Sequence, residues 1–342
     1  MTDGRSTPED SVTRFDVEAA VLDDARQAQA RVDAAPQSPS GRGAILMCAP
    51  DYFGVDYIIN PWMENQIGRA TLSRAKAQWA NLRGNLAAHS DIAFVAPTPG
   101  LPDMVFTANA GLAIGDTAVV SRFHAKERRP EERLFREWFE ARGYSIAPWP
   151  AHVPFEGAGD ALLDHARDIV WCGYGWRSDE AAAKHLERIF GRRAIALKLV
   201  DPRFYHLDTC FCPLSGAWLM YYPPAFAIES QEIIRAIAPA EKRIEVSEKD
   251  ALSFACNAVE ACGAIFLNAC SDALRARLID AGFRPVVTPL SEFMKAGGAA
   301  KCLTLQLPGA APAASCGGAE RFAADRPAAR AEGAGLERVE HA

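Results

Sequence analysis

Short apolar runs alternate with amphipathic segments along most of the chain. The apolar runs have the length and the aliphatic or aromatic content of strands, and they cover residues 44–50, 92–97, 117–123, 168–175, 194–200, 218–224 and 264–269. The amphipathic segments place apolar residues at the helical period, and they cover residues 69–89, 131–143, 178–191, 230–238 and 271–282. This alternation predicts an α/β fold.

One order of elements recurs within this pattern. Residues 132–150 (ERLFREWFEARGYSIAPWP) and 273–293 (ALRARLIDAGFRPVVTPLSEF) both read as a helix, a glycine stop, a short strand and then proline. The similarity is weak, but it indicates a repeated unit of about 50 residues, a period typical of propellers and arrays.

The two ends of the chain lack this pattern. Residues 1–42 are polar and run into a Pro/Ser/Gly cluster, with a short helical stretch predicted near 17–34. Residues 309–342 contain few large apolar side chains and many Ala, Gly, Pro and Arg, too little apolar surface to offset the entropy of ordering. We therefore expect a flexible N-terminal extension (1–42), a catalytic domain (43–308) and a disordered C-terminal tail (309–342).

The charge and the apolar content of the chain argue against nucleic-acid and membrane partners. The 342 residues include 37 Lys and Arg against 43 Asp and Glu, a net charge of -6, so the chain lacks the basic surface that tracks a phosphate backbone. No apolar run approaches the roughly 20 residues that cross a bilayer, and the N-terminus lacks the pattern of a signal peptide. We expect a cytoplasmic protein with no nucleic-acid or membrane partner; the oligomeric state is open, a homo-oligomer included.

Cys302 is the first candidate for chemistry. It follows the small-residue segment KAGGAA and Lys301 and precedes LTLQL, so a turn presents the thiol at the start of a strand. Lys301 would favour the thiolate, the nucleophilic form. On its own, a buried cysteine acting as a small apolar side chain is the favoured interpretation.

His206 and Asp208 form a second candidate. They flank Leu207, which predicts that both side chains lie on one face of a strand, and a carboxylate beside an imidazole orients the ring for proton transfer. A surface strand with two polar residues is an equal alternative. Cys210 and Cys212 continue this face and suggest zinc, but ligands that alternate along one strand do not converge into a tetrahedron.

Further polar residues stand next to small-residue turns. Glu156 lies between an apolar strand end and a Gly-x-Gly turn, where it has no capping role, whereas Asp160 fits the start of a helix as an N-cap. The Gly-x-Gly is too short for a dinucleotide fingerprint. Asn109 and Asn60, the latter before Pro61, both read on their own as ordinary loop residues.

Taken together and in order, five phrases resemble the guanidino-group modifying superfamily: NPWM (60–63), FTAN (106–109), FEGAGD (155–160), HLDT (206–209) and GGAAKC (297–302). Its members include arginine deiminases, dimethylarginine dimethylaminohydrolases and amidinotransferases. The resemblance covers nearly all of the patterned chain and implies an α/β propeller of five repeated ββαβ units.

The same resemblance implies roles for individual residues. Cys302 is the expected nucleophile, His206 the general acid/base, and Glu156 a carboxylate that binds the guanidinium or supports the histidine. Asp208 is expected to hold guanidinium nitrogens. The remaining expected substrate-binding residues are Asn60, Asn109, Arg128, Asp160 and Arg177, with the two arginines on the amino-acid carboxylate. No metal or cofactor is implied.

Asn109 departs from the deiminases, where a second aspartate stands in an FTRD-like phrase. Two carboxylates hold a cationic guanidinium symmetrically, whereas an amide also serves a neutral ureido group, so citrulline would be retained and attacked again. The phrases are most similar to the arginine dihydrolases, which convert arginine through citrulline to ornithine, ammonia and carbon dioxide. The alternatives are a dimethylarginine dimethylaminohydrolase, an arginine deiminase, an amidinotransferase, a catalytically silent arginine-binding protein and, weakest, a redox or zinc protein.

Overall fold

A computed structural model describes residues 44–308, and their strands form five sheets of three strands each. The predicted N-terminal extension and C-terminal tail lie outside the described residues. The strands are β1 (Ala44–Cys48), β2 (Asp91–Val95), β3 (Gly111–Ile114), β4 (Thr117–Val120), β5 (Ser145–Ile146), β6 (Ala161–Asp164), β7 (Ile169–Tyr174), β8 (Ala194–Lys198), β9 (Phe211–Leu214), β10 (Trp218–Tyr221), β11 (Arg243–Glu245), β12 (Val259–Ala261), β13 (Ala264–Leu267), β14 (Arg284–Val287) and β15 (Leu305–Leu307).

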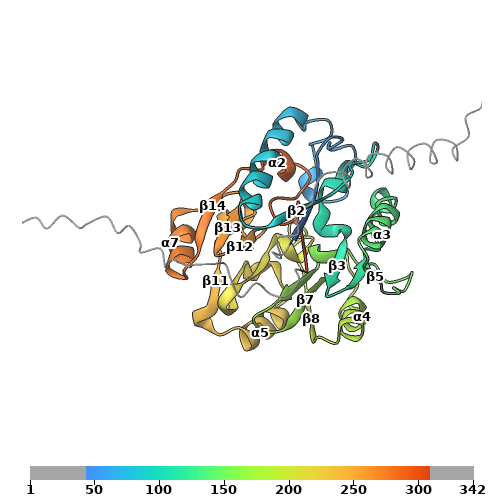
Figure 1. The fold of residues 1–342 in the computed structure, drawn as a ribbon. Coiled ribbons are helices and arrows are strands. Elements are labelled where there is room, and N and C mark those ends of the chain that lie inside the picture. Colours follow the sequence, from blue (N-terminus) through green and yellow to red (C-terminus); the bar gives the residue numbers. More distant parts are fainter. Residues whose placement is uncertain (1–43, 309–342) are drawn as a thin grey trace, which may run out of the picture.

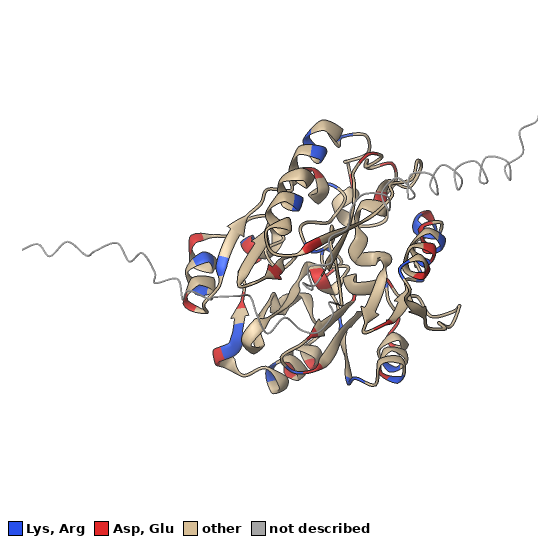
Figure 2. Ribbon diagram, viewed as in Figure 1, with Lys and Arg blue, Asp and Glu red and all other residues tan. Residues whose placement is uncertain are grey.

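The helices lie between these strands and on the outside of the molecule (Figure 1). They are α2 (Leu72–Ala87), α3 (Glu131–Ala141), α4 (Ala181–Phe190), α5 (Ile228–Ile237), α6 (Glu248–Leu252), α7 (Asp272–Asp280) and α8 (Ser291–Met294). Their outer faces carry charges of both signs, which Figure 2 shows on α3, α4 and α7. None of the helices within residues 44–308 is long and apolar enough to cross a membrane.

Each sheet is built in the same way. Two strands pair antiparallel, and after a helix a third strand pairs parallel to the second, as in β3, β4, α3 and β5. The first sheet joins the two ends of the described chain, because β15 pairs antiparallel with β1 while β2 pairs parallel with it. This arrangement confirms the predicted five-bladed α/β propeller of ββαβ units.

The seven apolar runs and the five amphipathic segments are confirmed as strands and helices, and the strands that the apolar pattern did not show are mostly first strands. β3, β6 and β9 have four residues each. A strand this short shows too few positions for alternation to stand out, so the apolar pattern did not predict these strands.

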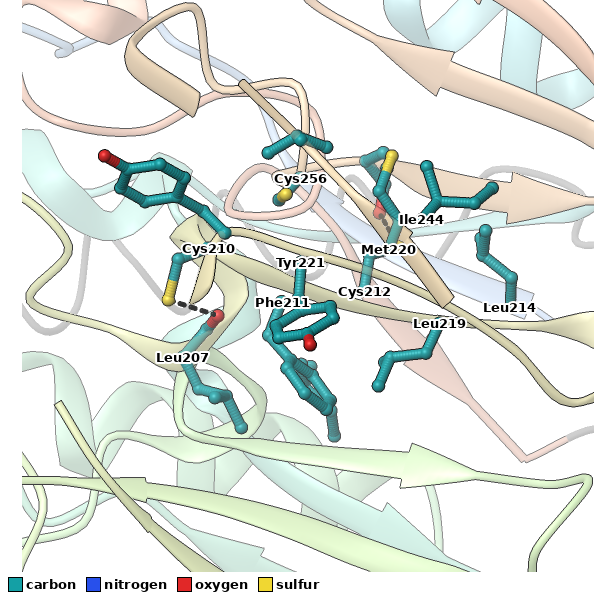
Figure 3. Close-up of a cluster of buried hydrophobic side chains, with 14 of the residues drawn as sticks. Leu207, Cys210, Phe211, Cys212, Leu214, Leu219, Met220, Tyr221, Ile244 and Cys256 are labelled. Atoms are coloured by element: carbon teal, nitrogen blue, oxygen red, sulfur yellow. Dashed lines mark hydrogen bonds between the residues drawn. The ribbon is translucent and has the colours of Figure 1, made fainter. Parts of the chain in front are cut away.

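Buried apolar side chains fill the space between neighbouring sheets. Figure 3 shows one such cluster: Phe211 and Tyr221, from paired strands β9 and β10, pack against each other on one face of their sheet, while Met220 and its β11 neighbour Ile244 lie on the other face. Cys210, Cys212 and Cys256 belong to the same cluster, and burial raises the pKa of each thiol. These three cysteines therefore act as small apolar side chains, and no group of His, Cys, Asp or Glu within residues 44–308 is arranged to hold a metal ion.

Candidate active site

The turns that precede the first strands of the sheets meet at the centre of the propeller. Three of them are 3-10 turns: Thr107–Ala110, Gly157–Gly159 and Leu207–Thr209. The other two are the segment before β12 and the segment before β15, which carries Cys302. The Ala108 amide donates to the Cys302 carbonyl at 3.1 Å. Residues far apart in sequence therefore share one buried site.

His206 is held between two carboxylates. Its Nδ1 lies 3.0 Å from Asp160 Oδ2 and its Nε2 lies 3.2 Å from Glu156 Oε2. Burial opposes the charged ring, but Asp160 and Glu156 outweigh it and raise the pKa of His206 to about 9. The imidazole is therefore protonated near neutral pH and ready to give a proton.

Asp160 does not start a helix, so the N-cap interpretation is wrong. It ends the 3-10 turn Gly157–Gly159 and precedes strand β6. Its Oδ1 accepts from the Leu207 amide at 3.1 Å, and its Oδ2 accepts from Ser178 Oγ at 2.6 Å in addition to facing His206. Asp160 thus fixes the histidine ring rather than a helix end.

Cys302 lies against Asp208. The Cys302 Sγ is 3.4 Å from Asp208 Oδ2 and 3.5 Å from Oδ1. Burial and the Asp208 charge raise the pKa of the Cys302 thiol, and burial likewise raises the pKa of Asp208 to about 6. These effects favour the protonated thiol, and a cation placed beside the two groups would favour the thiolate.

His206 and Asp208 do not share a strand, which corrects the predicted alternation. His206 is extended, but Leu207–Thr209 form a 3-10 turn and β9 begins only at Phe211. The turn sends the two side chains to different neighbours, His206 toward Glu156 and Asp208 toward Cys302.

The two predicted carboxylate-binding arginines are buried and already paired. Arg128 donates through Nε and Nη2 to the two carboxylate oxygens of Glu131, and its remaining hydrogen bonds go to Asn109 Oδ1 at 2.8 Å and to the Asp103 carbonyl at 3.1 Å. Arg177 donates to Glu156 Oε2 at 2.9 Å and to the Ile59 carbonyl at 2.7 Å. Arg177 and His206 lower the pKa of Glu156 against the effect of burial, so this carboxylate is ionised.

The two predicted asparagines join the site in different ways. Asn109 Nδ2 donates to the Glu156 carbonyl at 3.0 Å and lies 3.4 Å from His206 Nε2, so this amide touches both the histidine and Arg128. Asn60 caps the turn Pro61–Met63 through its Oδ1 and donates through Nδ2 to the Ala296 carbonyl at 3.0 Å. Asn60 therefore ties its loop to the segment that carries Cys302.

A small cavity lies at this site. Of the predicted residues, Asn60, Asn109, Arg128, Arg177 and Cys302 line the cavity. His206, Glu156, Asp160 and Asp208 are not among its lining residues; they are buried and contact one another or the lining residues. The structure thus brings all nine predicted residues into one site.

Two residues of this site escaped the sequence analysis. Asp103 also lines the cavity; its Oδ2 accepts from Tyr57 at 2.8 Å, whereas its buried Oδ1 has no hydrogen-bond partner among the described residues. Asn257 donates from Nδ2 to Cys302 Sγ at 3.0 Å. The available signal was a lone polar residue within an apolar segment: LPDMVF for Asp103 and SFACNAV for Asn257.

Comparison with known proteins agrees with this geometry. A family model described as N,N dimethylarginine dimethylhydrolase, eukaryotic, matches residues 56–308. The bifunctional arginine dihydrolase/ornithine cyclodeaminase ArgZ of Synechocystis is 50% identical over 77% of this chain and 37% of its own length. An N(G),N(G)-dimethylarginine dimethylaminohydrolase of Mycobacterium tuberculosis is 40% identical over 76% of this chain and 84% of its own length.

A solved structure is similar over the same region. The substrate-bound N-terminal domain of ArgZ, an arginine dihydrolase from cyanobacteria, superposes with a TM-score of 0.76 at 50% identity, covering 77% of this chain and 97% of that domain. The chain spans little more than a third of the full-length ArgZ, so the match concerns one part of that protein.

Proposed function

The chain belongs to the dimethylarginine dimethylaminohydrolase family, and from that premise we propose that it is a cysteine hydrolase of the arginine dihydrolase type. It would convert L-arginine and two waters, through citrulline, to ornithine, two ammonia molecules and carbon dioxide. The observation that carries the proposal is Asn109, an amide in the contact shell of His206 and Glu156. The 50% identity to an arginine dihydrolase domain supports it.

The cavity offers a matching charge for each end of the substrate. The Asp103 carboxylate, with Oδ1 unpaired, would take the α-ammonium group. Four of the five Arg128 N–H groups are already donated to protein partners, whereas Arg177 uses fewer. We therefore assign the α-carboxylate mainly to Arg177. The guanidinium would lie against Asp208 and Cys302.

The guanidinium carbon is a weak electrophile because its charge is spread over three nitrogens, so the site must orient it. The bound cation favours loss of the Cys302 proton to solvent, and the resulting thiolate adds to the carbon. Protonated His206 gives its proton to the departing ammonia, and the neutral ring then takes one from the water that cleaves the carbon–sulfur bond. This round yields citrulline and ammonia and returns the Cys302 thiolate and the protonated His206.

The second round depends on keeping citrulline in the site. A ureido group has a carbonyl acceptor as well as N–H donors, and Asn109 offers both functions whereas an aspartate only accepts. Attack of Cys302 on the ureido carbon and a second hydrolysis release ammonia, carbon dioxide and ornithine.

The test is a product assay with arginine, citrulline, methylated arginines and agmatine. Wild type is expected to form ornithine, and Asn109→Asp is expected to lower the ornithine-to-citrulline ratio about tenfold or more, since it loses a donor next to the reacting group. Cys302→Ser is the control and is expected to bind arginine without turnover. Wild type that stops at citrulline would leave a deiminase; full activity in Cys302→Ser would remove the covalent scheme.

A second candidate is release of dimethylamine from methylated arginine, which the family model and the mycobacterial relative favour. Dimethylamine measured in the same assay distinguishes it. The cytoplasmic location and the oligomeric state remain predictions that the product assay does not address.

A further inference from the structure

We propose that Asn257 positions the nucleophile: its side-chain amide stabilises the thiolate form of Cys302 relative to the thiol and fixes the turn that carries it. This inference rests on the proposed function, in which Cys302 attacks the substrate. Asn257 is fully buried and lies in the segment between α6 and β12, outside every phrase that carried the family resemblance.

The hydrogen bonds define which end of the amide faces the sulfur. Asn257 Oδ1 accepts from two backbone amides, Ala299 at 2.9 Å and Cys302 at 3.2 Å. Only the oxygen of the side chain accepts, so the other atom must be the nitrogen. That Nδ2 donates to Cys302 Sγ at 3.0 Å and to the Asp208 carbonyl at 3.0 Å. All donor and acceptor positions of the amide are thereby used.

The donor has a chemical consequence at the sulfur. A hydrogen bond to a charged acceptor is stronger than one to the neutral form, so Nδ2–H stabilises the thiolate over the thiol. It opposes burial and the Asp208 carboxylate, both of which raise the pKa of Cys302. Because the same side chain holds the Cys302 backbone, it also fixes the direction from which the sulfur approaches the substrate.

Asn257 occupies a place in the repeat where other sheets carry known site residues. It follows Asp208 by 49 residues and precedes Cys302 by 45, close to the repeat length of about 50. Each of these residues lies in the turn before the first strand of its sheet. Asn257 is thus the contribution of the fifth sheet to the central site.

Asn257→Asp tests the proposal because it keeps an oxygen for the two backbone amides and replaces the donor by a charged acceptor. The readout is alkylation of Cys302 by iodoacetamide as a function of pH, followed by mass spectrometry of the Cys302 peptide, together with kcat and KM for arginine. We expect alkylation at pH 7 to slow about tenfold or more, its pH midpoint to rise, and kcat to fall much more than KM rises.

The matched control is Asn268→Asp. Asn268 is also a buried amide near the fifth sheet, and it donates to the sulfur of Met294 at 3.0 Å and accepts from the Leu290 amide. This variant also places a carboxylate at a buried amide position, but it does not contact Cys302. Its alkylation profile is therefore expected to match wild type. A shift of equal size in both variants would overturn the proposal, because it would reflect general loosening.

Asn257→Ser provides the second variant if the aspartate does not fold. Its shorter side chain removes the donor from the sulfur, and the same direction of shift is expected. An unchanged alkylation profile in a folded Asn257 variant would overturn the proposal. Alkylation needs no substrate, so this result stands apart from the product assay: failure to make ornithine would refute the proposed function and leave the alkylation test intact.

Discussion

At the scale of single residues, the site is organised around a histidine that carries charge. His206 is 1% exposed and sits between Asp160 and Glu156, so its proton is bound more tightly in the folded protein than in the unfolded chain. The same two carboxylates that would make His206 an acid for the leaving ammonia therefore link folding to pH.

This linkage predicts the sign of the pH dependence. The folded pKa of His206 is about 9 against 6.5 for the ordinary group, so its contribution to stability is fully present below pH 6.5 and is lost as pH rises through 9. We expect wild type to lose about 3 kcal/mol of unfolding free energy over this window relative to His206→Gln, which cannot titrate. Urea denaturation at a series of pH values measures it. Parallel curves for the two proteins would show that the carboxylates do not hold the proton.

At the scale of elements, the 3-10 turns before the first strands do the positioning. The turn Gly157–Gly159 packs so tightly that a Cβ at Gly159 would lie 2.3 Å from Asn109 Nδ2, and one at Gly157 would lie 2.8 Å from the Ala108 carbonyl. The glycines of FEGAGD therefore allow neighbouring turns to touch, and the contact places Glu156 and Asn109 against His206.

A comparison of alanine substitutions at two glycines with the same φ angle distinguishes this packing effect from backbone strain. Gly157 and Gly115 both have φ of +63°, but only Gly157 has atoms within 4 Å of an added Cβ. Alanine at either position pays a similar conformational penalty of about 1 kcal/mol, and Gly157→Ala is expected to cost a further 1–3 kcal/mol or so from overpacking. Urea denaturation of both variants checks the difference, and equal losses would contradict it.

At the scale of the whole molecule, the repeat explains what could be predicted from the sequence. The outer helices and the longer strands follow from apolar periodicity, and the family resemblance led to the propeller and to nine residues that meet in one site. Asp160 was misread because GAGDALLD also fits a helix start, and its actual partner, His206, lies 46 residues away. Asn257 and Asp103 lie outside the phrases of the family resemblance. Their contacts with the site form only because segments from distant parts of the chain meet in the fold.

The pairing of β15 with β1 closes the ring of five sheets next to the active site. In this pairing, Leu305 lies opposite Leu46. Leu305 follows Cys302 by three residues, and its side chain is 1% exposed. The Leu46 carbonyl in turn accepts from Thr107 Oγ1 at 2.8 Å, in the turn that carries Asn109. A defect at the closing strand should therefore reach both the nucleophile and the amide.

Leu305→Ala tests whether closure is part of one cooperative structure. Deleting a buried leucine side chain is expected to cost about 2–5 kcal/mol, and in a single cooperative unit the entire urea transition moves to lower denaturant. The control is Gln306→Ala, one residue on, whose side chain is exposed and whose change should stay within about 0.5 kcal/mol. If β15 instead unfolded locally, Leu305→Ala would lose activity while the main urea transition stayed in place. That result would show that β15 unfolds independently of the rest of the domain.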